Sequence, residues 1–271
     1  MNIISFDIIP STNKYCARNI SSLTHGDVIT ARRQSAGRGR KSRKWSSEEG
    51  GLYFSLVLKE GLSLLKSPGT LTQLMALAVC KAARRAGAEA YIKWPNDVLA
   101  QGRKFCGILS EAVFEGQALK AVIVGVGINL SQKELNSDKP AVTLAELGVK
   151  ADAEVLLKEI IDNFNFNFEL LKRDGFEALR SSYKEAFLYL GKPVKMHIFE
   201  ETVQGTAEDI DAEGRLILRQ GETLRVINIG DKAYGYSIIG LQFSTGDGNR
   251  DERIQDLQLC RHKRYTAYRD I

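Results

Sequence analysis

The segment at residues 121–130 constrains the fold most, because its side chains alternate between two faces. A period of two is the pattern of a β-strand. Two glycines on one face, Gly125 and Gly127, leave a gap that a ligand or another stretch of backbone can enter. Close contact with a helix explains the same gap, so the glycines alone do not assign a function. One face carries Val122, Val124, Val126 and Ile128, and the other carries Ala121, Ile123, Gly125 and Gly127.

Other segments predict a chain that mixes strands and helices. Strands are expected at residues 3–8, 28–31 and 51–58, where branched and aromatic side chains gather. A first helix should begin after Ser11, a suitable N-cap, and run to about Asn19.

Two longer amphipathic helices follow, and we assign their apolar stripes to the core. The first helix meets a suitable stop at Gly87. The second has Asp152 as a cap and Gly175 near its end. The stripes comprise Leu71, Leu74, Met75, Ala78, Val79 and Ala82 in the first helix, and Leu157, Ile160, Ile161, Phe164, Phe168 and Leu171 in the second.

After Pro193 the chain changes to short strands with turns at Gly205, at residues 211–214 and at residues 220–221. This pattern indicates a small antiparallel barrel or sandwich.

We therefore expect three parts: a first domain at residues 1–185, a small β-domain at residues 186–240 and a polar tail at residues 241–271. The tail carries no convincing apolar pattern, and flexibility is our expectation for it.

Composition limits the class of protein. Of 271 residues, 44% are hydrophobic and 26% are charged, as in an ordinary soluble protein. A formal charge of +5 is mild for a protein that coats nucleic acid. Four widely spaced cysteines and three histidines argue against a zinc site and fit reduced thiols. The N-terminus resembles neither a signal peptide nor a membrane span, so we expect a cytoplasmic protein.

Residues 33–45 form a basic segment that contains glycines. Arg38 and Arg40 each follow a glycine, and Trp45 closes the segment. Glycine lets the backbone approach a ligand, guanidinium groups bind phosphate or carboxylate, and an indole offers a flat face to a base. Such a segment either holds a nucleotide or contacts nucleic acid as a phosphate-binding arm.

Residues 93–111 bring opposite charges together. If residues 101–102 form a two-residue hairpin turn, Leu99 faces Lys104 across the hairpin. Because side chains alternate along a strand, Asp97 and Lys104 then point to the same side. An exposed hairpin with solvated charges is the alternative.

Polar side chains also stand at the ends of two other elements. Ser11, Thr12 and Asn13, at the start of the first helix, either bind a polar head group or simply cap the helix. Asn129 ends the glycine-bearing strand and offers both a donor and an acceptor.

Taken in order, these motifs resemble those of the biotin–protein ligase family. The resemblance extends from residue 1 to about residue 236, and its string at residues 93–97 is rare. The matching residues are Ser11, Thr12 and Asn13; Gln34, Gly37, Arg38, Gly39, Arg40 and Trp45; Lys93, Trp94, Pro95, Asn96 and Asp97; Lys104, Gly107, Ile108 and Leu109; and Gly127, Ile128 and Asn129.

The resemblance implies an α+β fold. A mixed or antiparallel sheet flanked by helices, like that of class II synthetases, precedes a small C-terminal SH3-like β-barrel. It also implies an ATP-dependent ligase: the carboxylate of biotin attacks the α-phosphate of ATP, and a lysine of a biotin carboxyl carrier protein then takes the biotinyl group. Fixed cations and Mg²⁺ lower a barrier that is mostly charge repulsion.

The resemblance also implies roles for the motif residues. Arg40 and Lys104 are catalytic and bracket the reacting groups, while Asp97 organises either Mg²⁺ or Lys104. The basic segment would order over the labile adenylate as a lid. The expected biotin-binding residues are Ser11, Thr12, Asn13, Gln34, Gly37, Arg38 and Gly107, and the expected nucleotide-binding residues are Arg40, Trp45, Asn96, Asp97, Lys104 and Asn129.

Some family members carry an N-terminal winged-helix domain that binds DNA. Here the motifs begin at Ser11, so we expect neither that domain nor sequence-specific DNA binding. A homodimer is compatible with the resemblance, and residues 241–271 have no counterpart in the family pattern.

Two rival functions remain. A lipoate ligase or octanoyltransferase shares the catalytic fold, and strand alternation would put Cys106 beside Lys104, as a thiol-dependent transfer needs. However, those enzymes carry a histidine-bearing glycine loop unlike residues 36–40. A basic nucleic-acid-binding module would use residues 38–44 but gives Lys104 no role.

Overall fold

The computed structural model describes residues 2–40, 43–65, 67, 69–135, 137, 140–198, 201–228 and 237–240. The predicted tail at residues 241–271 lies outside the described residues. Within them, no helix is both long and apolar enough to cross a membrane.

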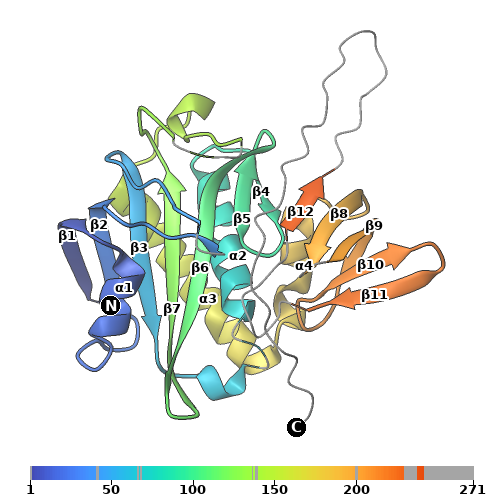
Figure 1. Ribbon diagram of the computed structural model, residues 1–271, viewed down its shortest axis with the longest axis horizontal. Helices are drawn as coiled ribbons and strands as arrows, with labels where there is room; N and C mark the ends of the chain where they lie inside the picture. Colours follow the sequence, from blue (N-terminus) through green and yellow to red (C-terminus); the bar gives the residue numbers. More distant parts are fainter. Residues whose placement is uncertain are drawn as a thin grey trace. The chain divides into compact units, whose positions relative to one another are not determined.

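A seven-stranded mixed sheet organises the N-terminal part of the chain (Figure 1). Its first two strands pair in parallel, and all other neighbours are antiparallel. The three strands predicted before residue 60 are confirmed. The strands lie in the order β1 (Ile3–Ile9), β2 (Val28–Gln34), β3 (Gly51–Leu58), β7 (Ala118–Asn129), β6 (Arg103–Glu115), β5 (Asp97–Ala100) and β4 (Ala90–Lys93).

Strand β7 lies at the middle of this sheet, and its alternating sequence is buried on both faces. Val122 and Val124 belong to the large hydrophobic core on one face. Ile123 belongs to a separate, smaller core on the other. Because side chains alternate, Gly125 and Gly127 continue the face of Ile123.

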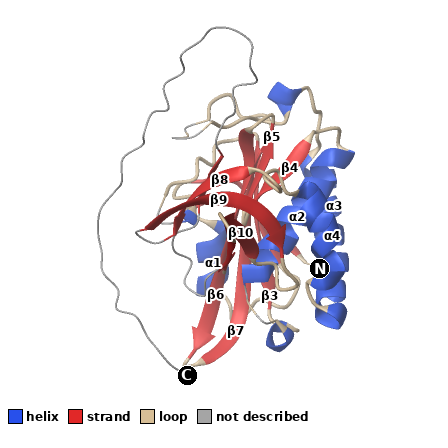
Figure 2. Ribbon diagram, turned by 90° about the vertical axis from the view of Figure 1, so that its right-hand side faces the viewer, coloured by secondary structure: helices blue, strands red, loops and turns tan. Residues whose placement is uncertain are grey.

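Helices cover both faces of the sheet (Figure 2). α2 (Gly69–Arg85), α3 (Ala153–Asp174) and α4 (Glu177–Ala186) lie on one face, and α1 (Thr12–Arg18) lies on the other. The predicted apolar stripes of α2 and α3 are buried. Asp152 caps α3 as predicted, by accepting hydrogen bonds from two backbone N–H groups at 2.9 Å.

The later strands form a five-stranded antiparallel sheet, which confirms the predicted small β-domain. One predicted turn is wrong, because Gly205 lies inside a strand. A Cβ there would overlap the carbonyl oxygen of Arg219, so this glycine permits close approach of two strands. The strand order is β11 (Thr223–Ile227), β10 (Leu216–Gln220), β9 (Glu201–Ile210), β8 (Pro193–Ile198) and β12 (Ser237–Gly240).

A turn between β9 and β10 contacts the first domain. The carbonyl of Gly214 accepts hydrogen bonds from Gln73 Nε2 at 2.8 Å and from Trp94 Nε1 at 3.3 Å. Nearby, Asp209 of β9 accepts a hydrogen bond from Arg180 of α4 at 2.7 Å. The β-domain is therefore bonded to α2, to α4 and to the string at residues 93–97.

Candidate active site

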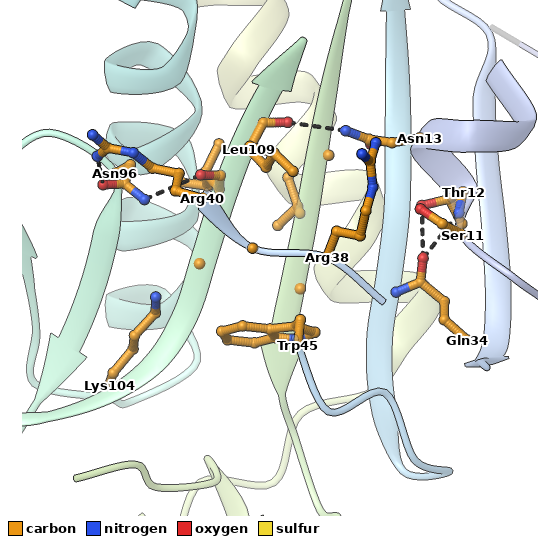
Figure 3. A pocket seen from close by; sticks show the side chains of 16 residues that line it. Ser11, Thr12, Asn13, Gln34, Arg38, Arg40, Trp45, Asn96, Lys104 and Leu109 are labelled. Carbon is orange, nitrogen blue, oxygen red and sulfur yellow. Dashed lines mark hydrogen bonds between the residues drawn. The ribbon is translucent and has the colours of Figure 1, made fainter. Parts of the chain in front are cut away.

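A pocket lies over the glycine face of β7 (Figure 3). Its walls come from α1, from the basic segment and from β6. Figure 3 places Ser11, Thr12 and Gln34 toward one end, and Arg40, Asn96 and Lys104 toward the other. Ten of the thirteen predicted site residues line it: Ser11, Thr12, Asn13, Gln34, Arg38, Arg40, Trp45, Asn96, Lys104 and Gly107.

Glycines form the floor of the pocket because side chains from α1 and from the basic segment lie directly on strand β7. A Cβ on Gly125 would overlap the amide of Asn13. A Cβ on Gly127 would overlap the indole of Trp45. The space above the β7 glycines is therefore occupied partly by Asn13 of α1 and Trp45 of the basic segment. The rest of that space belongs to the pocket.

The start of α1 is tied to β2 and β3. Ser11 is the N-cap, as predicted. The backbone N–H of Thr12 donates to Gln34 Oε1 at 2.9 Å. The buried Ser55 hydroxyl lies 2.7 Å from Thr12 Oγ1 and 2.5 Å from Asn13 Oδ1. These bonds fix the polar groups at this end of the pocket.

The basic segment is anchored where it leaves β2 and where it returns. Gln34 Nε2 donates to Ser47 Oγ at 2.9 Å. The N–H of Trp45 donates to the carbonyl of Gly37 at 3.0 Å. A Cβ on Gly37 would overlap Ser47 Oγ, so Gly37 shapes the segment and does not line the pocket.

Arg40 and Lys104 both reach the string at residues 93–97. Arg40 Nη1 donates to Asn96 Oδ1 at 2.5 Å. Lys104 Nζ donates to Asp97 Oδ1 at 2.6 Å, and Asn96 Nδ2 donates to the same oxygen at 3.1 Å. The predicted meeting of the Asp97 carboxylate and the Lys104 ammonium is thus present.

A tight hairpin turn sets the position of Lys104. Gln101 and Gly102 have φ angles of 49° and 72°. Positive φ at both central residues is the geometry of a type I′ turn, which suits the twist of paired strands. Leu99 pairs with Lys104 across the hairpin, as predicted.

The prediction that Cys106 shares a side with Lys104 is wrong. The register between β5 and β6 shifts after Lys104, which leaves Phe105 as the extra residue of a bulge. Lys104 and Gly107 line the pocket, whereas Cys106 is fully buried in the core. Burial raises the pKa of the Cys106 thiol, so this residue supplies no thiolate to a transfer reaction.

Trp45 lies over the floor, next to Lys104. Lys104 Nζ is 5.1 Å from the centre of the indole, within cation–π range. The indole N–H is buried and has no hydrogen-bond partner among the described residues. A buried donor without an acceptor is destabilising, and an acceptor on a bound ligand would remove that penalty.

Lys93 of β4 pairs with Asp97 of β5 across the two strands. Its pKa is lowered, mainly because burial disfavours the ammonium, although the charge of Asp97 acts in the opposite direction. The nearby charge of Lys104 lowers the pKa further.

Asn129 lies outside the pocket lining. Its side chain is 4% exposed at the end of β7. Its amide donates to the carbonyl of Val142 at 3.4 Å, and its oxygen accepts from Gln132 Nε2 at 3.3 Å. Both polar ends are therefore engaged within the protein.

Two residues that support the site, Ser55 and Glu111, lie outside the sequence motifs. Ser55 is fully buried in β3, and a lone hydroxyl inside an apolar strand was its only signal. Glu111 closes the segment at residues 93–111, yet nothing in the alternation of that strand distinguishes it from a solvated carboxylate.

The residues that the structure describes contain no group of three or more His, Cys, Asp or Glu side chains placed to hold a metal ion. Mg²⁺ usually binds through one or two carboxylates and the phosphates of a substrate. Asp97 fits such partial coordination, because its hydrogen bonds to Lys104 and Asn96 both use Oδ1.

The fold and the pocket together define a protein in which fixed cations stand over a glycine floor, an arrangement that suits a small anionic ligand. The model of the Biotin/lipoate A/B protein ligase family matches residues 5–129. A second model, Biotin protein ligase C terminal domain, matches residues 189–231.

Curated relatives agree over most of the chain. The bifunctional ligase/repressor BirA of Bacillus subtilis is 33% identical over 243 residues, which cover 86% of this chain and 74% of the relative. The biotin–[acetyl-CoA-carboxylase] ligase of Paracoccus denitrificans is 32% identical over 83% of this chain and 97% of its own length. The chain belongs to the biotin–protein ligase family.

Solved structures agree as well. The biotin protein ligase of Aquifex aeolicus in complex with biotin and ATP superimposes with a TM-score of 0.78 and 28% identity. The match covers 89% of this chain and 99% of that protein. It therefore includes both the seven-stranded and the five-stranded sheet.

Proposed function

We propose that the chain is an ATP-dependent biotin–protein ligase. It activates biotin with ATP to biotinyl-5′-AMP and transfers biotin to a lysine of a biotin carboxyl carrier protein. The ligases named above support this activity. The observation that carries it is the convergence of Arg38, Arg40 and Lys104 on one glycine-floored pocket.

Adenylation requires two anions, the biotin carboxylate and the α-phosphate, to approach each other. Arg40 and Lys104 offset the repulsion between these anions. Because Asn96 and Asp97 hold both cations in place before substrate arrives, little reorganisation is needed in the transition state. The carboxylate oxygen bonds to the α-phosphorus while the bond to pyrophosphate breaks.

We assign the biotin ring to the end of the pocket beside α1. A ureido ring carries N–H donors and a carbonyl acceptor, and the hydroxyl and amide groups there match both. Arg38 extends toward the carboxylate. The proposed biotin residues are Ser11, Thr12, Asn13, Gln34, Arg38 and Gly107, with Gly37 shaping the segment that carries Arg38.

We assign the nucleotide to the end that contains Arg40, Asn96 and Lys104, with Trp45 over the adenylate. Asn129 would bind adenine only by exchanging its bond with Gln132 for one to the base. Ordering of the basic segment over the adenylate would exclude water.

We propose that Asp97 would hold the Mg²⁺ that accompanies ATP, through the carboxylate oxygen that Lys104 and Asn96 leave unused. Bound there, the ion would neutralise phosphate charge during adenylation. Lys104 remains paired with Oδ1 of the same carboxylate, so one residue would orient the lysine and contact the metal.

The purified protein, mixed with biotin, MgATP and a biotin-carrier domain, tests the proposed function. We expect biotin-dependent release of pyrophosphate and one labelled lysine on the carrier. Absence of both would overturn the assignment. Labelling with lipoate or octanoate in place of biotin would instead support the related ligases, which share the first family model.

A further inference from the structure

Glu111 joins two parts of the pocket that are far apart in the sequence. Its carboxylate accepts from Arg38 Nη2 at 2.7 and 3.0 Å. It also accepts from Asn13 Nδ2 at 2.7 Å. One side chain on β6 therefore connects the basic segment to the start of α1, and Figure 3 shows Arg38 and Asn13 side by side.

The contact between Glu111 and Arg38 leaves most of the guanidinium available. Both short distances involve Nη2. No described residue bonds to Nε or Nη1 of Arg38. A guanidinium presents five N–H donors in a rigid plane, so fixing one nitrogen orients the others. The carboxylate thus aims the arginine without occupying the edge that a ligand would use.

The contact between Glu111 and Asn13 determines which way that amide points. Asn13 Nδ2 donates to Glu111 and to the carbonyl of Leu109, the latter at 3.2 Å. The Asn13 oxygen then faces the Ser55 hydroxyl at 2.5 Å. A rotated amide would set its NH2 group against the Ser55 side and its oxygen against the carboxylate, which is repulsive.

Stability does not account for this arrangement. The side chains of Arg38 and Glu111 are 40% and 32% exposed. Ion pairs that remain this accessible to water contribute little to folding. The effect of Glu111 should therefore be found in ligand binding.

We propose that Glu111 is a positioning residue for the activation of biotin, holding Arg38 and Asn13 in the orientations that bind biotin. This inference rests on the proposed ligase function. Glu111 acts through its two partners and need not touch the substrate itself.

Glu111→Gln is the informative substitution, because it preserves shape but leaves one acceptor oxygen for two donors. We expect the KM for biotin in pyrophosphate release to rise about tenfold, the loss typical of one charge-assisted hydrogen bond. The kcat at saturating biotin should change much less, and the melting temperature should stay the same. Glu115→Gln is the matched control, since Glu115 lies on the same strand and pairs only with exposed Lys120 among the described residues.

A double-mutant cycle with Arg38→Ala tests whether Glu111 acts through Arg38. In the Arg38→Ala background, Glu111→Gln should raise the KM by clearly less than in the wild type, because only the Asn13 contact remains to be lost. A wild-type KM for Glu111→Gln, a lowered KM, or an equal effect in both backgrounds would each overturn the inference. If the wild-type protein itself releases no pyrophosphate, the proposed function has failed instead.

Discussion

Lys104 and Arg40 are held in place by neutral or anionic neighbours before any substrate binds. Lys104 is bonded to Asp97, and Arg40 is bonded to Asn96. Both partners belong to a single short string, so one segment positions two cations from different elements. Preorganised charges of this kind are the main source of catalysis in reactions that bring anions together.

Replacing these cations should separate two steps of the reaction. Lys104→Ala should lower the rate of adenylate formation by about 100-fold, because a fixed charge at the reacting atoms is lost. Arg40→Ala should chiefly weaken retention of the adenylate, seen as faster release of biotinyl-AMP into solution. Single-turnover assays with labelled ATP measure both quantities, and Lys120→Ala provides an exposed-lysine control. Unchanged kinetics in both variants would refute the assigned roles.

For single residues, the sequence predicts the site residues that belong to a local motif. It misses those whose partners are distant in the sequence. Ser11, Lys104 and Trp45 were identifiable because their neighbours in sequence are distinctive. Glu111 was not, since its bond to Asn13 spans 98 positions. Such a contact depends on the order of strands in the sheet, which local periodicity does not encode.

The hairpin between β5 and β6 is the element that delivers Lys104 to the pocket. Its alternation was readable from sequence, and so was its turn. The bulge at Phe105 was not, because an extra residue leaves no mark in the apolar pattern. Because of that bulge, the next residue after Lys104 to face the pocket is Gly107, and Cys106 faces the core instead.

The same hairpin contains a site for stabilisation. Gln101 is the only described residue other than glycine with positive φ. Asparagine tolerates that conformation better and is preferred at this position of a type I′ turn. Gln101→Asn should therefore raise the free energy of unfolding by about 0.5–1 kcal/mol, as measured by urea denaturation. The KM values should not change, and a less stable variant would contradict this account of the turn.

At the scale of the whole molecule, the β-domain is bonded to the segment that holds Arg40 and Lys104. The carbonyl of Gly214 receives hydrogen bonds from Trp94 and Gln73. The change from helical periodicity to short strands with turns predicted a separate β-domain. The sequence indicated neither this contact nor helix α4. The acceptor in this contact is the backbone carbonyl of Gly214, and every residue has such a carbonyl, so the sequence does not mark this one.

Two glycines of the β-domain allow a controlled test of that contact. Gly214 and Gly221 both have positive φ, but only Gly214 lacks room for a Cβ, which would overlap Gln73. Gly221→Ala should cost about 1 kcal/mol through backbone strain. Gly214→Ala should cost roughly 2 kcal/mol more, because the contact with α2 must open. Thermal unfolding of both variants measures the difference, and equal losses would show that the contact contributes nothing.

The two-faced sequence of strand β7 limits which insertions and deletions the protein can accept. Its valines belong to the main core, and its glycines form the floor of the pocket. Inserting or deleting one residue ahead of Val124 would exchange the two faces, placing valines on the pocket floor and glycines against α2. A length change in this strand is therefore disfavoured unless a β-bulge absorbs it, as at Phe105 in β6, and substrate preference can diverge more readily through the elements that cover the pocket.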